Sequence, residues 1–240
     1  MKNKKVISLL FCIIIAVVYY TATVNESYGE TRDIPVIDCG TQFDYSMIPE
    51  FDGETPYVII NDNKPYYEDD ISSMENSFEE YGRLDGRGRC TTVIANIGKD
   101  LMPTEERGSI GSVKPTGWQV SKYDFVDGKY LYNRCHLIGF QLTGENANKQ
   151  NLITGTRYMN VEGMLPFEEM VADYIKETGN HVLYRVTPIF VGNELVARGV
   201  VMEAMSVEDG GEGICYNVFC YNNQPGVVID YETGDNELAK

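Results

Sequence analysis

The sequence predicts an α+β fold in which an antiparallel sheet flanks one long helix. Runs rich in β-branched and aromatic residues recur between turn residues along the chain. Residues 164–178 instead place apolar side chains at helical spacing and end at Gly179. Residues 182–191 and 195–207 are two such runs joined by a short turn, as in an antiparallel hairpin. Together these patterns favour strands and a helix packed as separate layers.

The first 29 residues are a predicted export segment. Three lysines lie within residues 1–5, and an apolar run follows over residues 6–24. A basic head before an apolar stretch orients a chain across a membrane with its lysines inside. Ser27 and Gly29 are small residues that suit cleavage after Gly29, yet the apolar run nearly reaches the roughly 20 residues of a spanning helix. We expect residues 1–29 to be a signal peptide or an N-terminal membrane anchor. The protein would then be secreted or anchored to the outer face of the cell membrane.

Residues 30–240 are long enough to bury one sizeable core and are expected to form a single domain. The lead-in is rich in Asp, Pro and Gly, and the acidic stretch at residues 68–80 fits either a helix or a loop. In chain order we expect an irregular segment at 30–55, strands at 57–61 and 90–97, a turn at 114–118, two short strands within 123–132 around Asp127 and Gly128, the helix at 164–178, the hairpin at 182–207, and strands at 214–221 and 227–231.

The charge balance is acidic, with a formal net charge of −16. Proteins that bind nucleic acid usually present a basic face, so this balance alone argues against a polyanionic partner. The sign is unevenly distributed, because acidic residues crowd residues 68–80 and the tail from residue 230. Basic residues gather instead at Arg83, Arg87, Arg89, Arg107, Lys114, Lys122, Lys129 and Arg134. A local basic groove on an acidic protein is compatible with this pattern.

Cysteine usage does not predict a zinc site. Of six cysteines, Cys12 lies in the apolar run, which leaves Cys39, Cys90, Cys135, Cys215 and Cys220. No CxxC pair or His–Cys cluster is present in the sequence. One or two disulfides are compatible with export, but the sequence leaves their partners open. Cys215 and Cys220 would face opposite sides of one regular strand, so they are an unfavourable pair.

Two histidines are present, and one of them lies among residues suited to catalysis. His181 follows a Gly-Asn turn and is expected to be structural. His136 ends the segment Tyr132-Asn-Arg-Cys-His136, where it could equally be a histidine satisfied by a carbonyl group. A neutral imidazole is a suitable base near pH 7. Arg134, two residues earlier, faces the same side in an extended chain and can contact the same phosphate.

Phosphodiester hydrolysis needs a base, a cation and fixed donors for the phosphate. Asn160 offers an amide oxygen, a hard ligand suited to magnesium, which retains several waters and needs few protein ligands. Residues 151–160 follow the polar loop at residues 144–150, so this asparagine comes shortly after the His136 segment. The sequence therefore places a base, an arginine and a metal ligand in one region.

This ordered set resembles a known family. Asn133-Arg-Cys-His136 is similar to the DRGH/NRSH-type motif of the DNA/RNA non-specific endonuclease family, which belongs to the ββα-metal nucleases. The spacing to Asn151 and Asn160, then to Gly163-Met164 and Phe167-Glu168, resembles the secreted or membrane-anchored Gram-positive DNase branch. The resemblance extends over roughly residues 80–235, with Gly108-Ser-Ile-Gly111, Pro115-Thr-Gly-Trp118 and Tyr184-Arg-Val-Thr187 inside it. It implies a core in which a strand pair presents the histidine and the following helix presents the metal-binding asparagine.

The resemblance also implies roles for individual residues. His136 corresponds to the general base, Asn160 to the direct ligand of Mg²⁺ or Mn²⁺, Asn151 to a supporting active-site asparagine, Arg134 to the phosphate-contacting arginine and Glu168 to a glutamate near the water shell of the metal. Glu162 and Glu169 leave the register of that glutamate open. Arg87, Arg89 and Lys114 are weaker candidates for substrate binding. Each assignment has a plain alternative, such as a loop end for Asn151, a helix end for Asn160 or a solvated helix face for Glu168.

Two positions depart from the pattern. Asn133 stands where many members have aspartate, so any orienting role loses its charge. Cys135 replaces the usual Gly or Ser, and beside His136 it raises the alternative of a cysteine nucleophile. That alternative lacks an evident oxyanion site and an orienting third group. Cys135 could also form a disulfide or an oxidisable thiol.

We therefore expect an exported, divalent-metal-dependent endonuclease that cuts DNA, with RNA as a further candidate substrate, without sequence specificity. Contacts in such enzymes fall mainly on phosphate and sugar. One alternative is a nuclease toxin with an immunity partner. Another is a non-catalytic nucleic-acid-binding module on the same fold, in which the charge of −16 and Asn133 reflect lost activity.

Overall fold

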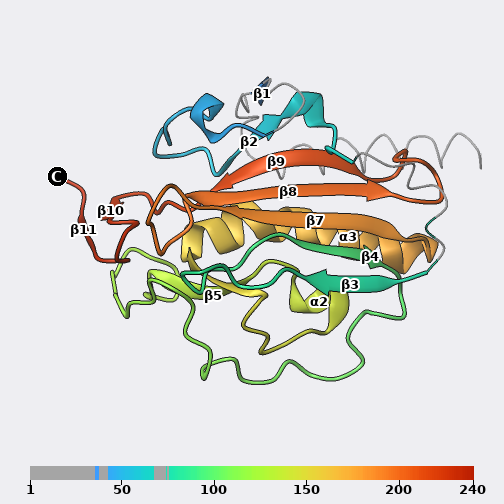
Figure 1. The fold of residues 1–240 in the computed structure, drawn as a ribbon, viewed down its shortest axis with the longest axis horizontal. Helices are drawn as coiled ribbons and strands as arrows, with labels where there is room; N and C mark the ends of the chain where they lie inside the picture. Colours follow the sequence, from blue (N-terminus) through green and yellow to red (C-terminus); the bar gives the residue numbers. More distant parts are fainter. Residues whose placement is uncertain (1–35, 38–42, 68–73, 75) are drawn as a thin grey trace, which may run out of the picture. The chain divides into compact units, whose positions relative to one another are not determined.

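The computed structural model describes residues 36–37, 43–67, 74 and 76–240, and residues 34–240 form one compact unit. In this part of the chain a seven-stranded sheet has the order β1-β2-β9-β8-β7-β4-β3 (Figure 1). Neighbouring strands are antiparallel except for β1 and β2. The strands are β1 (Val36–Ile37), β2 (Tyr57–Ile60), β3 (Phe78–Tyr81), β4 (Val93–Ile97), β7 (Val182–Ile189), β8 (Gly199–Ser206) and β9 (Cys215–Tyr221).

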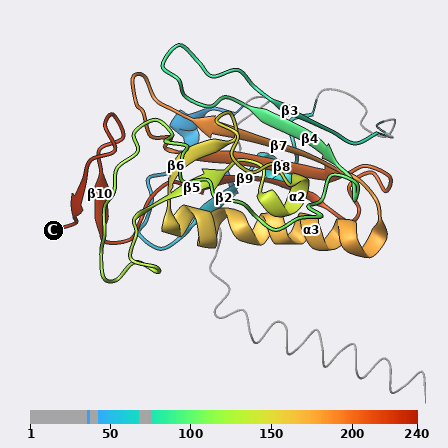
Figure 2. The same cartoon turned by 90° about the horizontal axis from the view of Figure 1, so that it is seen from below.

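One face of the sheet packs against the long helix α3 (Leu165–Thr178), which runs along the strands (Figure 2). Alternate residues of each strand face the helix, because side chains point to opposite sides of a strand in turn. Val182, Tyr184 and Val186 of β7 thus join Val171 and Ile175 of α3 in the main hydrophobic core. The helix ends at Gly179, whose φ of 76° lets its N–H donate to the Ile175 carbonyl.

The other face of the sheet is covered by residues that precede β3. Phe43, Tyr45 and Phe51 pack on Phe219 and Tyr221 of β9. The intervening residues of β7 and β4 form a smaller cluster there, with Leu183 and Ile94 contacting Tyr67 and Met74. The central strands are therefore buried on both faces of the sheet.

A separate antiparallel hairpin and the helix that follows it carry the candidate site. The hairpin pairs β5 (Tyr132–His136) with β6 (Leu152–Thr156). The short helix α2 (Phe140–Thr143) lies between the two strands in sequence. After β6 the chain enters a π-helical turn, η4 (Met159–Met164), which continues directly into α3. The remaining hairpin pairs β10 (Val227–Ile229) with β11 (Asn236–Leu238).

The π turn has a cause in the sequence. Pro166 has no N–H to donate, and its ring would crowd the carbonyl four residues earlier, so a regular α-helical turn that ran through this junction would be disfavoured. The Leu165 N–H donates instead to the Asn160 carbonyl, five residues back. Such wide turns occur within α-helices and are frequent at functional sites.

The structure confirms the α+β prediction, the helix and most strands. The strand β3 is a correction, because Phe78–Tyr81 lies within residues expected to be helix or loop. Residues 123–132 were predicted as two strands but form turns with one isolated bridge, Lys122 to Tyr130. The strands β1, β6 and β11 lie outside the predicted strand ranges, and β5 begins at Tyr132, where the predicted pair of strands ends. The export segment at residues 1–29 lies outside the described residues, and none of the described helices is long and apolar enough to span a bilayer.

Candidate active site

A cavity of about 670 Å³ lies where the β5–β6 hairpin meets η4 and α3. Four of the predicted site residues line it together, namely His136 and Arg134 from β5, Asn160 from η4 and Glu168 from α3. Arg134 and His136 share this side because β5 is extended and they are two residues apart. The structure therefore brings together residues that are up to 34 positions apart in the sequence, the difference between 168 and 134.

The imidazole of His136 is held in one tautomer by the backbone. Its Nε2 lies 2.7 Å from the Asn146 carbonyl oxygen, so Nε2 carries the proton and donates it. Its Nδ1 is then the acceptor and lies 3.2 Å from a guanidinium nitrogen of Arg107. The pKa of His136 is lowered from 6.5 to about 4, mainly by burial and also by the Arg107 charge, against the opposing effect of the Asn146 carbonyl. At neutral pH the ring is therefore neutral and its free lone pair is on Nδ1.

Glu168 places a carboxylate in the wall of the cavity, where it is 9% exposed. Burial raises its pKa from 4.5 to about 8, with Glu169 adding to the rise and Arg107 opposing it. The carboxylate packs against the backbone of Gly139, where a Cβ atom would lie 2.6 Å from Oε2. Glu162 and Glu169 are exposed, so the structure places Glu168 rather than either neighbour in the cavity.

The donor set suits a hard divalent cation. An amide oxygen from Asn160 and a buried carboxylate from Glu168 line the same cavity, and these oxygen ligands are the type that magnesium and manganese prefer. The pKa of Glu168 is raised to about 8 because its ionised form is poorly stabilised in this buried position. A bound cation would stabilise that ionised form. Among the described residues no cluster of three or more His, Cys, Asp or Glu side chains could enclose a metal. Asn160 and Glu168 would therefore hold a cation that keeps much of its water.

Asn151 lies behind the cavity rather than in it. Its side chain is fully buried and spans the turn after β5, with Oδ1 accepting from the Ile138 N–H at 2.8 Å and Nδ2 donating to the Ile138 carbonyl at 3.0 Å. Its own carbonyl accepts from the Leu137 N–H. We predicted a site residue here, and the contacts make Asn151 a positioning residue that fixes the chain immediately after His136.

Arg134 is held at the cavity wall by several contacts. Its guanidinium donates to the carbonyls of Val113 and Gly111, and Cζ lies 4.1 Å from the ring centroid of Trp118. These contacts fix the plane of the guanidinium while leaving it at the surface of the cavity. A planar, preoriented guanidinium is suited to bind a phosphate group.

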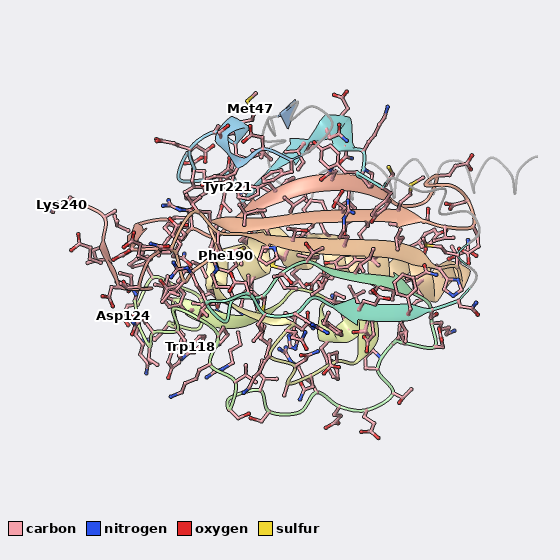
Figure 3. All side chains as sticks on the ribbon, viewed as in Figure 1. Met47, Trp118, Asp124, Phe190, Tyr221 and Lys240 are labelled. Atoms are coloured by element: carbon pink, nitrogen blue, oxygen red, sulfur yellow. The ribbon has the colours of Figure 1, made fainter. Side chains whose placement is uncertain are left out.

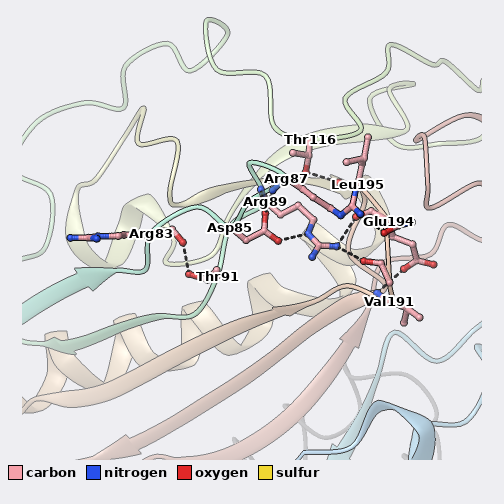
Figure 4. Close-up of polar contacts among 11 residues, drawn as sticks. Arg83, Asp85, Arg87, Arg89, Thr91, Thr116, Val191, Glu194 and Leu195 are labelled. Carbon is pink, nitrogen blue, oxygen red and sulfur yellow. Dashed lines mark hydrogen bonds and ion pairs between the residues drawn. The ribbon is translucent and has the colours of Figure 1, made fainter.

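The three weaker candidates for substrate binding do not line this cavity, and their contact with substrate stays a prediction. Arg87 donates to the Asn193 side chain, and Arg89 pairs with Asp85 at 2.6 Å and donates to the Gly192 and Glu194 carbonyls (Figure 4). Lys114 lines a different and much smaller cavity of about 60 Å³. The two arginines tie the segment before β4 to the β7–β8 loop, because loop carbonyls there need donors. Their clustering in the sequence reflects this structural role.

Two arginines in the cavity were not predicted as site residues, although Arg107 was among the basic residues of the expected local groove. Arg107 contacts His136, and Arg157 lines the cavity while pairing with Asp127 at 2.6 Å. Arg107 comes from an irregular loop 29 residues before His136, a separation that no local pattern encodes. Arg157 directly follows β6, and this position next to the strand pair is the feature of the sequence from which it could have been predicted as a site residue.

None of the four cysteines in the described part of the chain lines the cavity. Cys135 is fully buried in the core, and burial raises the pKa of its thiol far above the usual range. A thiol without thiolate character is a poor nucleophile, so the alternative of cysteine catalysis is not supported. Cys90, Cys135, Cys215 and Cys220 are all free, and Cys39 lies outside the described residues. His181 is paired with Glu208 at 2.6 Å, away from the cavity.

The pKa of Glu168 is raised and that of His136 is lowered, and these opposite shifts predict how the free energy of unfolding depends on pH in the metal-free protein. Folded Glu168 keeps its proton up to about pH 8 whereas the unfolded chain loses it near 4.5, so the free energy of unfolding falls as pH rises through this window. Folded His136 binds its proton only below about 4 against 6.5 when unfolded, so its contribution rises with pH up to 6.5. The two effects oppose each other below 6.5, and only the Glu168 effect remains above it.

We therefore expect urea unfolding in EDTA to show a loss of stability between about pH 6.5 and 8. Glu168→Gln removes the titrating group, so its stability should be flatter over that range. Adding Mg²⁺ at pH 8 should stabilise the wild type more than Glu168→Gln, because a ligand of the folded state raises stability by mass action. Parallel pH curves for the two proteins would contradict the buried-carboxylate assignment.

Comparison with known proteins agrees with this geometry. Residues 70–208 match the DNA/RNA non-specific endonuclease family. A deoxyribonuclease of Streptococcus dysgalactiae subsp. equisimilis is 26% identical over 257 residues, covering 89% of this chain and 76% of that protein. NucA from Streptococcus agalactiae, solved with magnesium ion bound, has a TM-score of 0.67 at 24% identity and covers 75% of this chain and 86% of its own. Sda1 nuclease, solved with bound zinc ion, has a TM-score of 0.61 at 26% identity and covers 77% and 96%. The likeness in fold bears out the predicted ββα-metal arrangement.

Proposed function

Because the chain belongs to the DNA/RNA non-specific endonuclease family, whose model matches more than half of it, we propose that it is an exported endonuclease that hydrolyses DNA with the help of a divalent cation. RNA is a second substrate under this proposal, since contacts limited to phosphate and sugar do not read the base. The apolar run at residues 6–24 supports export. The cation we propose is Mg²⁺, with Mn²⁺ as a substitute, because the oxygen donors of Asn160 and Glu168 suit both.

The observation that carries the proposal is the fixed tautomer of His136. With its Nε2 proton donated to the Asn146 carbonyl, Nδ1 carries the lone pair that can remove a proton from an attacking water once Arg107 leaves it. The Asn146 carbonyl also stabilises the imidazolium that forms, as an acceptor for Nε2–H. A ring whose pKa lies at about 4 in the metal-free protein is neutral, and hence competent as a base, throughout the neutral range.

The Arg107 guanidinium and the attacking water would both bind the Nδ1 lone pair of His136, and this gives Arg107 a role in the proposal. In this structure a guanidinium nitrogen of Arg107 lies 3.2 Å from Nδ1, where the water would have to bind. Arg107 is exposed and lines the cavity, so a phosphate entering there can attract its guanidinium and release the lone pair. Arg107 and Arg134 would then bind the phosphate from two sides, and a bound cation would stabilise charge on the phosphate and leaving oxygens.

The rival proposals use the same residues in other ways. A toxin with an immunity partner would have the same catalytic cavity, so the cavity does not distinguish it. A non-catalytic module would have no need for the tautomer of His136 or for the buried carboxylate of Glu168, and both features favour an enzyme. Plasmid digestion by the purified protein separates enzyme from module. We expect cutting of unrelated plasmids with Mg²⁺ and none in EDTA, whereas equal inactivity under both conditions would refute the proposal.

The sparse cations of the cavity predict a weak salt dependence of binding. Arg107, Arg134 and Arg157 line it, and three phosphate contacts give a slope of about −3 for the logarithm of the association constant against that of salt concentration. Arg134→Ala should lower the magnitude of this slope by about 1. Arg87→Ala is the matched control and should leave it unchanged, because that guanidinium is bonded to Asn193. Titrations of duplex DNA in EDTA measure the slope, and a value near about −10 would reveal a basic surface elsewhere.

A further inference from the structure

One wall of the cavity is apolar and exposed, although the proposed hydrolysis does not use it. Trp118, Val120, Tyr130 and Tyr132 line the same cavity as His136 and Glu168. Val120 is 72% exposed and Tyr130 is 49% exposed. We call residues 118–132 the aromatic segment, and Figure 3 shows Trp118 and Asp124 of this segment toward the end of the sheet where Lys240 lies. Large apolar side chains exposed beside a cavity are typical of a binding surface.

The backbone holds this wall in a defined shape. The Leu131 N–H donates to the Ser121 carbonyl at 3.0 Å, and the Tyr123 N–H donates to the Lys129 carbonyl at 2.9 Å. Lys129, with a φ of 67°, and Gly128 before it form the reversal between the two sides. Tyr130 is therefore presented from a paired segment rather than from an unpaired loop, so its ring loses little further freedom when it contacts a ligand.

Cations accompany both rings. The Lys122 ammonium lies 4.5 Å from the ring centroid of Tyr130, and the Arg134 guanidinium carbon lies 4.1 Å from that of Trp118. Aromatic side chains interleaved with cations are the combination that binds single-stranded nucleic acid, in which rings stack on bases and cations follow the backbone. The exposed Tyr130 ring, which lines the same cavity as the proposed base His136, thus has the chemistry to stack on an unpaired nucleobase.

The charge of the protein makes such a contact useful. The protein has a net charge of −16, and of the three arginines that line the cavity Arg157 is already paired with Asp127. Stacking on an aromatic ring does not depend on net charge and adds affinity for each base that stacks. In a duplex the bases are already stacked on one another, and extruding one has a cost in free energy. A stacking site therefore favours unpaired strands.

We propose that the aromatic segment is a base-stacking subsite, in which Tyr130 stacks on an unpaired base next to the phosphate that is cut, and that it makes single-stranded DNA the preferred substrate. The proposal rests on the proposed nuclease function and adds the class of substrate. Val120 and Trp118 complete the apolar wall of the cavity. Lys122, whose ammonium lies against the Tyr130 ring, would contact the strand backbone.

The test compares Tyr130→Ala with two matched variants in binding to an oligothymidylate and to a DNA duplex of equal length, both in EDTA. Stacking interactions predict that Tyr130→Ala weakens binding of the single strand by about tenfold or more, with a change below about twofold for the duplex. Tyr130→Phe keeps the ring and should bind as the wild type does. Phe125→Ala removes another exposed ring of the same segment that lies outside the cavity, and it should change neither affinity.

Three outcomes would overturn the subsite. They are unchanged single-strand binding by Tyr130→Ala, an equal loss for strand and duplex, and a loss in Phe125→Ala as large as in Tyr130→Ala. The slope of affinity against salt should stay the same in Tyr130→Ala, since no phosphate contact is removed. With Mg²⁺ present, the KM for single-stranded DNA should rise while kcat changes little. A wild type that binds the oligonucleotide but cuts nothing would refute the nuclease function and leave the binding result interpretable.

Discussion

His136→Ala is expected to lower the rate of DNA cleavage by at least about 10²-fold while the protein stays folded, the lower range for loss of a general base. His136 ends β5, and its Nδ1 is the acceptor nitrogen because Nε2 donates to the Asn146 carbonyl. Alanine removes the acceptor but leaves Arg107, Arg134 and the cation ligands in place, so DNA binding should change little. Single-turnover cleavage of a labelled duplex measures the step directly.

His181→Ala is the matched control for this experiment. It removes the other histidine of the chain, which pairs with Glu208 outside the cavity, and it should cut at the wild-type rate. Partial rescue of His136→Ala by added imidazole would support the role of a base. A folded His136→Ala protein that cuts at near the wild-type rate would refute the mechanism.

The second large effect is expected for Asn160→Ala, which should reduce turnover by at least about 10²-fold, because a metal ion contributes several kcal/mol of charge stabilisation in the transition state. Asn160 offers one neutral oxygen, so we expect weak metal binding and a requirement for cation in roughly the millimolar range. Activity should survive replacement of Mg²⁺ by Mn²⁺ and disappear in EDTA. DNA binding should persist, since Arg134 is untouched.

Metal titrations of variants decide this prediction. Asn160→Asp adds charge and should tighten the metal, yet it removes the amide hydrogens, so its activity should still fall below that of the wild type. Asn180→Ala, beyond the far end of α3, is the control and should titrate as the wild type does. Normal cutting by Asn160→Ala, or full activity in EDTA, would move the metal site elsewhere.

The fold was predictable where the sequence pattern was local. Helix α3 follows from apolar spacing and from Gly179 at its end, and β7 and β8 follow from two long β-branched runs. The edge strand β3 was missed because Phe78–Tyr81 contains two glutamates, which resemble a solvated segment. Charged residues on an edge strand hinder its pairing with other chains. The same charged residues make the strand difficult to recognise from the sequence.

The site was predictable only in part, for a related reason. Arg134 and His136 are linked by the period of one strand, and that link can be read from the sequence. Arg107 reaches His136 from a distant loop, which only the folded chain reveals. Arg87 and Arg89 looked like a basic patch but bind the carbonyls and side chain of the β7–β8 loop. The sequence gives the charge of a side chain, but it does not show which group that side chain binds in the folded protein.

The π turn η4 sets the angular phase of the helix that carries the two proposed oxygen donors. Each residue of an α-helix rotates by about 100°, so the eight steps from Asn160 to Glu168 would total about 800°, about 80° beyond two full rotations. A π turn accommodates one extra residue, so those eight steps act as about seven and total about 700°, within about 20° of two rotations. This phase is consistent with both residues lining the same cavity. Pro166 has no proposed ligand role of its own, yet its position directly after η4 accompanies the wide turn that lets Asn160 and Glu168, two turns apart, line the same cavity.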